Sequence, residues 1–126
     1  MSLAVHQNYS LKGLNTLGFD VVAEHFVQPD TLEALQEALL LSEANQWPVL
    51  MLGGGSNLIL SNHIPGLVIQ LANRGIELVN SSAEDVVVEV AGGENWHQMV
   101  ETTLEQGWYG LENLALIPGT VGAAPI

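Results

Sequence analysis

The chain has 126 residues, of which 48% are hydrophobic and only 13% are charged, so it has the size of one domain or of part of a larger protein. Its 14 acidic and two basic side chains give a net charge of −12, which argues against partners such as nucleic acid and anionic membranes, since both are bound through lysine and arginine. The absence of cysteine excludes disulfides, thiolate metal sites and cysteine nucleophiles, and no apolar run reaches the ~18 residues that a membrane-spanning helix needs.

The N-terminal region predicts no secretion signal. Its opening residues, MSLAVH, lack a basic stretch followed by an apolar one, and the lack of cysteine fits a reducing compartment. We therefore expect a cytoplasmic protein, with irregular structure over residues 1–20. The four histidines show no spacing typical of a zinc site, so we expect no metal and assign them ordinary structural or surface roles.

The first half of the chain predicts a β-α-β unit. Asp30 is a good helix N-cap, and Glu33 stands three residues later at the spacing of a capping box. A helix over 31–45 follows, because apolar or small residues recur at helical intervals: Leu32, Leu35, Ala38, Leu39 and Ser42. Short apolar runs flank the helix and are expected to be buried parallel strands joined by a right-handed crossover: Val21–Val27, Val49–Leu52 and Leu67–Leu71.

The second half predicts a hairpin and a second helix. The strands are expected at Ile76–Val79 and Val86–Ala91, joined by the polar turn NSSAED. A helix capped by Glu94 or Asn95 then runs to about residue 106, and Gly107 is suited to its C-terminal end. One face of this helix carries Trp96, Met99, Val100, Thr103 and Leu104.

A boundary between two lobes is expected within residues 70–75. The segment 1–72 would form a first α/β lobe, and 73–126 would begin a second, incomplete lobe, because the sequence stops inside a glycine- and proline-rich segment. The high apolar content predicts that part of the surface is covered, either by further chain or by another subunit. We therefore expect self-association of these 126 residues when they are isolated.

Two glycine-rich segments stand beside buried elements: LGGGSNL at 52–58 and PGTVGAA at 118–124. Glycine lets backbone N–H groups converge on an anion, and Ser56, Asn57 and Thr120 add side-chain donors. The segments therefore suit a phosphate or diphosphate, while a tight turn and a packed loop that bind no ligand are the alternatives. No lysine follows the glycines, so a P-loop is excluded, and Leu58 occupies the third glycine position of a dinucleotide-binding fingerprint.

Four motifs in this order resemble the UDP-N-acetylenolpyruvoylglucosamine reductase family: NTLG at 15–18, LGGGSNLIL at 52–60, GGENWHQMV at 92–100 and GLENLALIPGTVGAAPI at 110–126. The resemblance covers essentially the whole chain and corresponds to the N-terminal part of a longer flavoenzyme. It implies an α/β FAD-binding fold of the vanillyl-alcohol oxidase and p-cresol methylhydroxylase type, here truncated, with 1–72 and 73–126 as the two FAD-binding lobes.

The resemblance also implies which residues bind FAD. The first glycine segment would wrap the FAD diphosphate and the second would line the other side of the flavin, with Thr16 near the adenosine end. The expected cofactor-binding residues are Leu52, Gly53, Gly54, Gly55, Ser56, Asn57, Ile117, Pro118, Gly119, Thr120, Gly122, Ala123 and Ala124.

The activity implied is an NADPH-dependent reduction in peptidoglycan synthesis, and hence in cell-wall biogenesis, cell shape and cell division. Hydride would pass from NADPH to the flavin and on to UDP-N-acetylglucosamine enolpyruvate, giving UDP-N-acetylmuramate. The catalytic residues of such enzymes lie further along the chain, so we expect none in residues 1–126 and no activity of this fragment alone. Two alternatives stay open: another FAD-linked oxidase of the same superfamily, and a noncatalytic fragment that packs with a partner chain.

Overall fold

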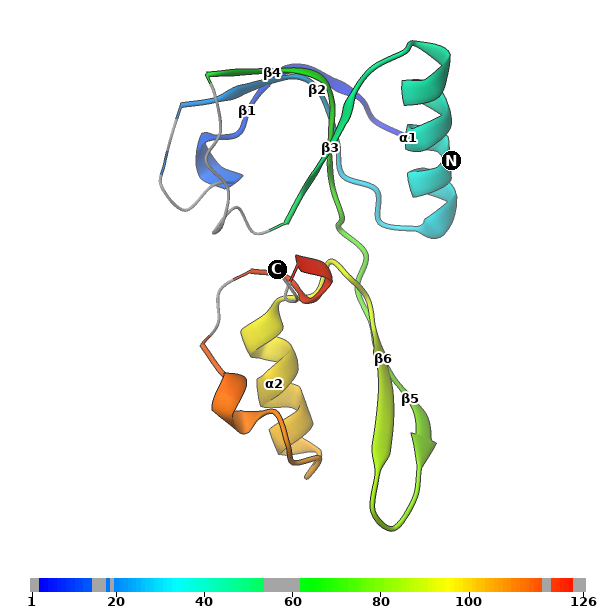
Figure 1. The fold of residues 1–126 in the computed structure, drawn as a ribbon, viewed down its shortest axis with the longest axis vertical. Coiled ribbons are helices and arrows are strands. Elements are labelled where there is room, and N and C mark those ends of the chain that lie inside the picture. The colour runs from blue at the N-terminus through cyan, green and yellow to red at the C-terminus, as the bar shows by residue number, and fades with distance from the viewer. Residues whose placement is uncertain (1–2, 15–17, 19, 54–61, 117–118, 124–126) are drawn as a thin grey trace. The chain divides into compact units, whose positions relative to one another are not determined.

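The computed structural model describes residues 3–14, 18, 20–53, 62–116 and 119–123. The chain divides into two compact units, Met1–Ala72 and Asn73–Ile126 (Figure 1). The division falls between residues 72 and 73, and the assignment of each unit as an FAD-binding lobe stays a prediction. Among the described residues, no helix has the length and apolar character needed to cross a membrane.

The first unit contains a mixed sheet with the strand order β1-β2-β4-β3. β2 and β3 run parallel to β4, which lies between them, whereas β1 is antiparallel to β2. The strands are β1 (His6–Ser10), β2 (Val22–Val27), β3 (Val49–Leu52) and β4 (His63–Gln70). The predicted α/β class and the parallel pairing are therefore confirmed.

Helix α1 (Leu32–Ala44) packs against β4 (Figure 1). Its N-cap is Thr31, whose Oγ1 accepts the N–H of Ala34 at 3.1 Å. The predicted cap at Asp30 is therefore wrong, and Glu33 stands at the second helical position, where it cannot complete a capping box.

The sequence prediction was wrong about the burial of β3, and the residues of α1 at helical intervals are only partly buried. Of the apolar or small α1 residues at helical intervals, Ala38 and Ser42 are buried, whereas Leu32 and Leu39 are exposed. β3 was expected to be buried, but Val49 is 41% and Met51 48% exposed. The reason is topological: β3 is the last strand of the described sheet, so it has only one neighbouring strand.

The core of this unit lies on both faces of β2 and β4, which is typical of parallel strands. Phe26 and Val68 belong to one cluster of buried side chains. Val27, Leu67 and Ile69 belong to a second cluster, which Ala38 of α1 joins. The expectation of irregular structure over residues 1–20 is wrong at β1. Its sequence HQNYS is polar, and only Tyr9 is half-buried, stacked on Phe26 with ring centroids 4.4 Å apart.

The second unit contains an antiparallel hairpin, two 3-10 turns and one longer helix. The elements are β5 (Ile76–Ser81), β6 (Val86–Val90), α2 (Trp96–Glu105), η2 (Glu112–Leu114) and η3 (Val121–Ala123). Asn95, one of the two predicted caps, caps α2 by accepting the N–H of Gln98 at 3.0 Å. Gly107 follows the helix with φ +78°, as expected of a helix-ending glycine. The helix buries Met99, Val100 and Thr103, whereas Leu104, on the same predicted face, is 37% exposed.

Candidate cofactor-binding segments

The first glycine-rich segment begins at the carboxyl end of β3. Leu52 is the last residue of that strand and is buried, and Gly53 follows it half-buried. The other candidates of this segment (Gly54, Gly55, Ser56 and Asn57) lie outside the described residues, as does Thr16. Their predicted contacts with FAD therefore stay predictions.

Two glutamine side chains connect Gly53 to the neighbouring strands through hydrogen bonds. Gln28 follows β2, and Gln70 is the last residue of β4. Gln28 Nε2 donates to Gln70 Oε1 at 2.8 Å, and Gln70 Nε2 donates to the carbonyl oxygen of Gly53 at 3.2 Å. Since β2, β4 and β3 are parallel neighbours in that order, the two amides cross the carboxyl ends of the strands, where open α/β sheets bind their ligands.

Sequence reasoning missed these two hydrogen bonds, from Gln28 to Gln70 and from Gln70 to Gly53, which we call the amide relay. A signal for them is nevertheless present in the sequence. A glutamine stands at the carboxyl end of each of two apolar runs, in FVQ at 26–28 and VIQ at 68–70. Parallel strands bring their carboxyl ends to one edge of a sheet, so equivalent polar residues at those ends become neighbours. The relay fixes the direction of the backbone where the glycine-rich segment starts.

The second glycine-rich segment packs against the turn that precedes α2. The N–H of Trp96 donates to the carbonyl oxygen of Gly119 at 3.0 Å, and the N–H of Val121 donates to that of Glu94 at 2.8 Å. These bonds form an isolated antiparallel bridge between Asn95 and Thr120. Of the predicted site residues here, Gly119, Thr120, Gly122 and Ala123 are described, whereas Ile117, Pro118 and Ala124 lie outside the described residues.

The backbone donors of this segment divide into two groups. The N–H groups of Gly122 and Ala123 are used within the chain, because they donate to the carbonyl oxygens of Gly92 at 2.9 Å and Thr120 at 3.1 Å. Within the described ranges, the N–H groups of Gly119 and Thr120 and the Thr120 hydroxyl have no hydrogen-bond partner. Two successive free N–H groups beside a hydroxyl suit an anionic oxygen, so Gly119 and Thr120 fit a diphosphate-containing cofactor.

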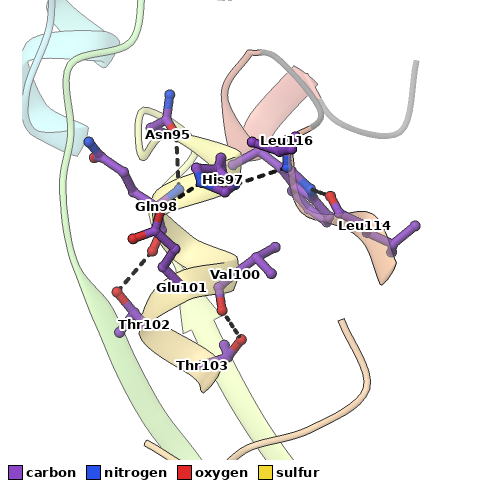
Figure 2. A network of polar contacts seen from close by, with 10 residues as sticks. Asn95, His97, Gln98, Val100, Glu101, Thr102, Thr103, Leu114 and Leu116 are labelled. Atoms are coloured by element: carbon purple, nitrogen blue, oxygen red, sulfur yellow. Dashed lines mark hydrogen bonds and ion pairs between the residues drawn. The ribbon is translucent and has the colours of Figure 1, made fainter. Parts of the chain in front are cut away.

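The residues before this segment are held by the first turn of α2 (Figure 2). Trp96 Nε1 donates to the carbonyl oxygen of Leu114 at 2.8 Å, and His97 Nδ1 accepts the N–H of Leu116 at 2.9 Å. The other ring nitrogen of His97 lies 2.5 Å from Glu101 Oε1. The expectation of an ordinary structural role for His97 therefore omitted a specific contact with the segment that leads to Gly119.

Charged groups close to α2 are also paired. Arg74 Nη1 donates to the carbonyl oxygen of Gly93, and Arg74 Nε lies 3.8 Å from Glu94 Oε1. The N–H of Gly110 donates to Glu112 Oε2 at 2.7 Å and, with the backbone N–H of Glu112 itself, lowers the pKa of that carboxyl below its usual 4.5. Arg74 is one of only two basic residues of the chain, so most of the favourable environment for an anion comes from N–H groups.

Comparison with known proteins gives consistent matches. The UDP-N-acetylenolpyruvoylglucosamine reductases of Chromobacterium violaceum and Pseudomonas fluorescens strain Pf0-1 are 50% and 49% identical to this chain over 126 residues. The aligned region is 100% of this chain and 37% of each relative, so the chain spans little more than a third of their length. The crystal structure of UDP-N-acetylenolpyruvylglucosamine reductase from Thermus caldophilus matches with a TM-score of 0.68 and 29% identity, covering 98% of this chain and 41% of that one.

The family assignment comes from a match over most of the sequence. The model of the FAD binding domain family matches residues 23–126, which include both glycine-rich segments. The predicted FAD-binding fold and the prediction of FAD as the cofactor are thereby confirmed, and the chain belongs to the family of FAD binding domains.

Proposed function

We propose that these 126 residues are the FAD-binding part of an NADPH-dependent UDP-N-acetylenolpyruvoylglucosamine reductase. The observation that carries the proposal is that relatives of this name align with every residue of the chain at about half identity. The product would be UDP-N-acetylmuramate for peptidoglycan synthesis, made in the cytoplasm. Cell-wall biogenesis, and through it cell shape and cell division, would depend on the reaction.

In this proposal the chain binds and orients the cofactor. When bound, FAD supplies hydride transfer from NADPH to the enolpyruvyl group. The N–H groups of Gly119 and Thr120 bind an oxygen of the cofactor, and Gly53 to Asn57 enclose the diphosphate. Gln70 holds the start of the first segment, and the first turn of α2 holds the approach to the second.

We assign no catalytic role to a residue of this chain. The described side chains close to Gly119 and Thr120 hold the backbone: Trp96 and His97 bind main-chain atoms, and Glu94 is paired with Arg74. The groups that protonate and polarise the substrate are then supplied by other parts of the enzyme, and residues 1–126 alone have no reductase activity.

The proposal is tested with the protein at its natural length, purified and supplied with FAD. NADPH oxidation is followed by absorbance with and without UDP-N-acetylglucosamine enolpyruvate, and the product is identified by mass spectrometry. The proposal predicts oxidation that depends on the enolpyruvyl sugar nucleotide and yields UDP-N-acetylmuramate. A flavoprotein that oxidises NADPH only with oxygen, and leaves the sugar nucleotide unchanged, would instead be another FAD-linked oxidase.

We also propose that the isolated 126 residues self-associate through β3. Val49 and Met51 expose apolar side chains on the last strand of the described sheet, and such an edge has main-chain groups available to pair with another copy. Gel filtration of the fragment with light scattering tests this proposal: a concentration-dependent oligomer supports it, and a monomer at all concentrations contradicts it.

A further inference from the structure

We infer that His97 is a positioning residue. Glu101 fixes the tautomer of its ring, and the ring holds the backbone of Leu116 so that the N–H groups of Gly119 and Thr120 can bind the cofactor. The inference rests on the proposed role of Gly119 and Thr120 in binding FAD. His97 itself touches neither residue. It binds Leu116, which precedes them in the chain (Figure 2).

The hydrogen bonds determine the tautomer of the imidazole. Because the N–H of Leu116 donates to His97 Nδ1, this nitrogen carries no proton. The proton of the neutral ring is then on Nε2, which lies 2.5 Å from Glu101 Oε1 and donates to it. A carboxylate can only accept, so Glu101 selects the tautomer that leaves Nδ1 free to accept the Leu116 N–H.

Within the described ranges, the bond to His97 is the hydrogen bond that the Leu116 backbone makes. Its φ is +65°, in the left-handed region that residues other than glycine rarely adopt. Its side chain is 80% exposed, so packing contributes little to holding it there. The described contact that holds this conformation is the bond to His97, whose side chain is 32% exposed.

Other contacts of α2 fix the same segment on both sides of Leu116. Trp96 Nε1 holds the carbonyl oxygen of Leu114, and the N–H of Trp96 holds that of Gly119. Glu112 of η2, the element that packs against α2, is directed instead to the N–H of Gly110. Glu101 is therefore the charged partner of His97 among the described residues, and the first turn of α2 binds the backbone of Leu114, Leu116 and Gly119.

Two substitutions separate the acceptor from the rest of the side chain. In His97→Asn, the amide oxygen can occupy the place of Nδ1 and accept the Leu116 N–H. In His97→Gln, the longer amide can reach the place of Nε2 and keep a partner in Glu101, but the Leu116 N–H loses its acceptor. His6→Gln is the control, because His6 is exposed in β1.

The measurements use the protein at its natural length. In His97→Gln, hydrogen exchange of the Leu116 amide should accelerate and the Kd for FAD should rise, each roughly tenfold, as expected for the loss of one ordered hydrogen bond. His97→Asn and His6→Gln should stay within about twofold of wild type. Equal losses in His97→Asn and His97→Gln, or no change in His97→Gln, would overturn the inference.

The tautomer provides a readout that needs no variant and no cofactor. Nitrogen chemical shifts of the His97 ring should show a protonated Nε2 and an unprotonated Nδ1 at neutral pH, and the opposite tautomer overturns the inference. If the wild-type protein does not bind FAD, the proposed function fails. The tautomer and the exchange of the Leu116 amide then still decide whether His97 holds Leu116.

Discussion

Gly122 lies against Gly92: its N–H donates to the Gly92 carbonyl oxygen at 2.9 Å, and a Cβ on Gly122 would stand 3.0 Å from that same oxygen. This contact joins the second glycine-rich segment to the turn before α2. The glycine is therefore needed for close packing of two backbones, in addition to any role next to FAD.

Gly122→Ala should push the segment away from Gly92. Because the nearest neighbours of the new methyl group are backbone atoms that cannot turn aside, the substitution should destabilise the second unit by about 1–3 kcal/mol. It should also weaken FAD binding, since Gly119 and Thr120 are close in sequence. Hydrogen exchange of the Val121 amide and the Kd for FAD measure the two effects, and normal values of both would contradict the packing role.

Gly66→Ala should damage the first unit more severely. A Cβ on Gly66 would lie 2.3 Å from the carbonyl oxygen of Pro48, and φ is +81°. Steric overlap and backbone strain together predict a loss of roughly 3 kcal/mol in the free energy of unfolding. The matched control is Gly13→Ala, because a Cβ there has nothing within 4 Å. Denaturant unfolding of both variants measures the difference, and equal stabilities would show the prediction to be wrong.

Gln70→Glu should weaken FAD binding through the first glycine-rich segment. A carboxylate at this position cannot donate to the carbonyl oxygen of Gly53, although it can still accept from Gln28. We expect the Kd for FAD to rise roughly tenfold, because the half-buried carbonyl oxygen of Gly53 loses its donor.

Gln70→Met is the control for the added charge. It removes the donor to the Gly53 carbonyl oxygen without adding a negative charge. A general electrostatic penalty on FAD would appear only in Gln70→Glu. The hydrogen bond is supported if both variants raise the Kd measured by flavin fluorescence, and a normal Kd in Gln70→Met contradicts its role.

The contact between Glu112 and Gly110 should depend on pH in the acidic range. The bond from the Gly110 N–H lowers the pKa of Glu112 from 4.5. Its contribution to stability is therefore complete above pH 4.5 and is lost as the pH falls through the lower value of the folded protein.

Nuclear magnetic resonance measures this pH dependence directly. The carboxyl carbon of Glu112 and the amide proton of Gly110 should titrate together with a midpoint below 4.5. In Glu112→Gln the Gly110 amide should be insensitive to pH over that range. A midpoint at or above 4.5, or separate midpoints for the two groups, would contradict the bond.

The parts of the fold that the sequence predicted are those in which burial controls the residue pattern. Runs such as Leu67 to Ile69 are apolar on successive residues because both faces of β4 are covered. β1 was not predicted because it is a strand through its pairing with β2 and not through burial of its side chains. Exposure of β3 depends on strand order, which local sequence does not determine.

The contacts around the candidate site were less predictable because they join residues far apart in sequence. The hydrogen bond between His97 and Leu116 joins residues 19 positions apart in sequence, and the one between Gln28 and Gln70 joins residues 42 positions apart. The first contact also requires a leucine with positive φ, which no propensity favours. Sequence motifs could therefore indicate the glycine-rich segments but not the side chains that hold them.

The central claim is that main-chain N–H groups in two glycine-rich segments bind FAD, and a crystal structure of the natural-length protein with FAD tests it most directly. We predict that oxygen atoms of the cofactor lie within hydrogen-bond distance of N–H groups in both segments, with Gly53 to Asn57 on the diphosphate and with Gly119 or Thr120 also bound to the cofactor. A complex in which FAD is held by other residues, with either segment remote from it, would contradict the claim.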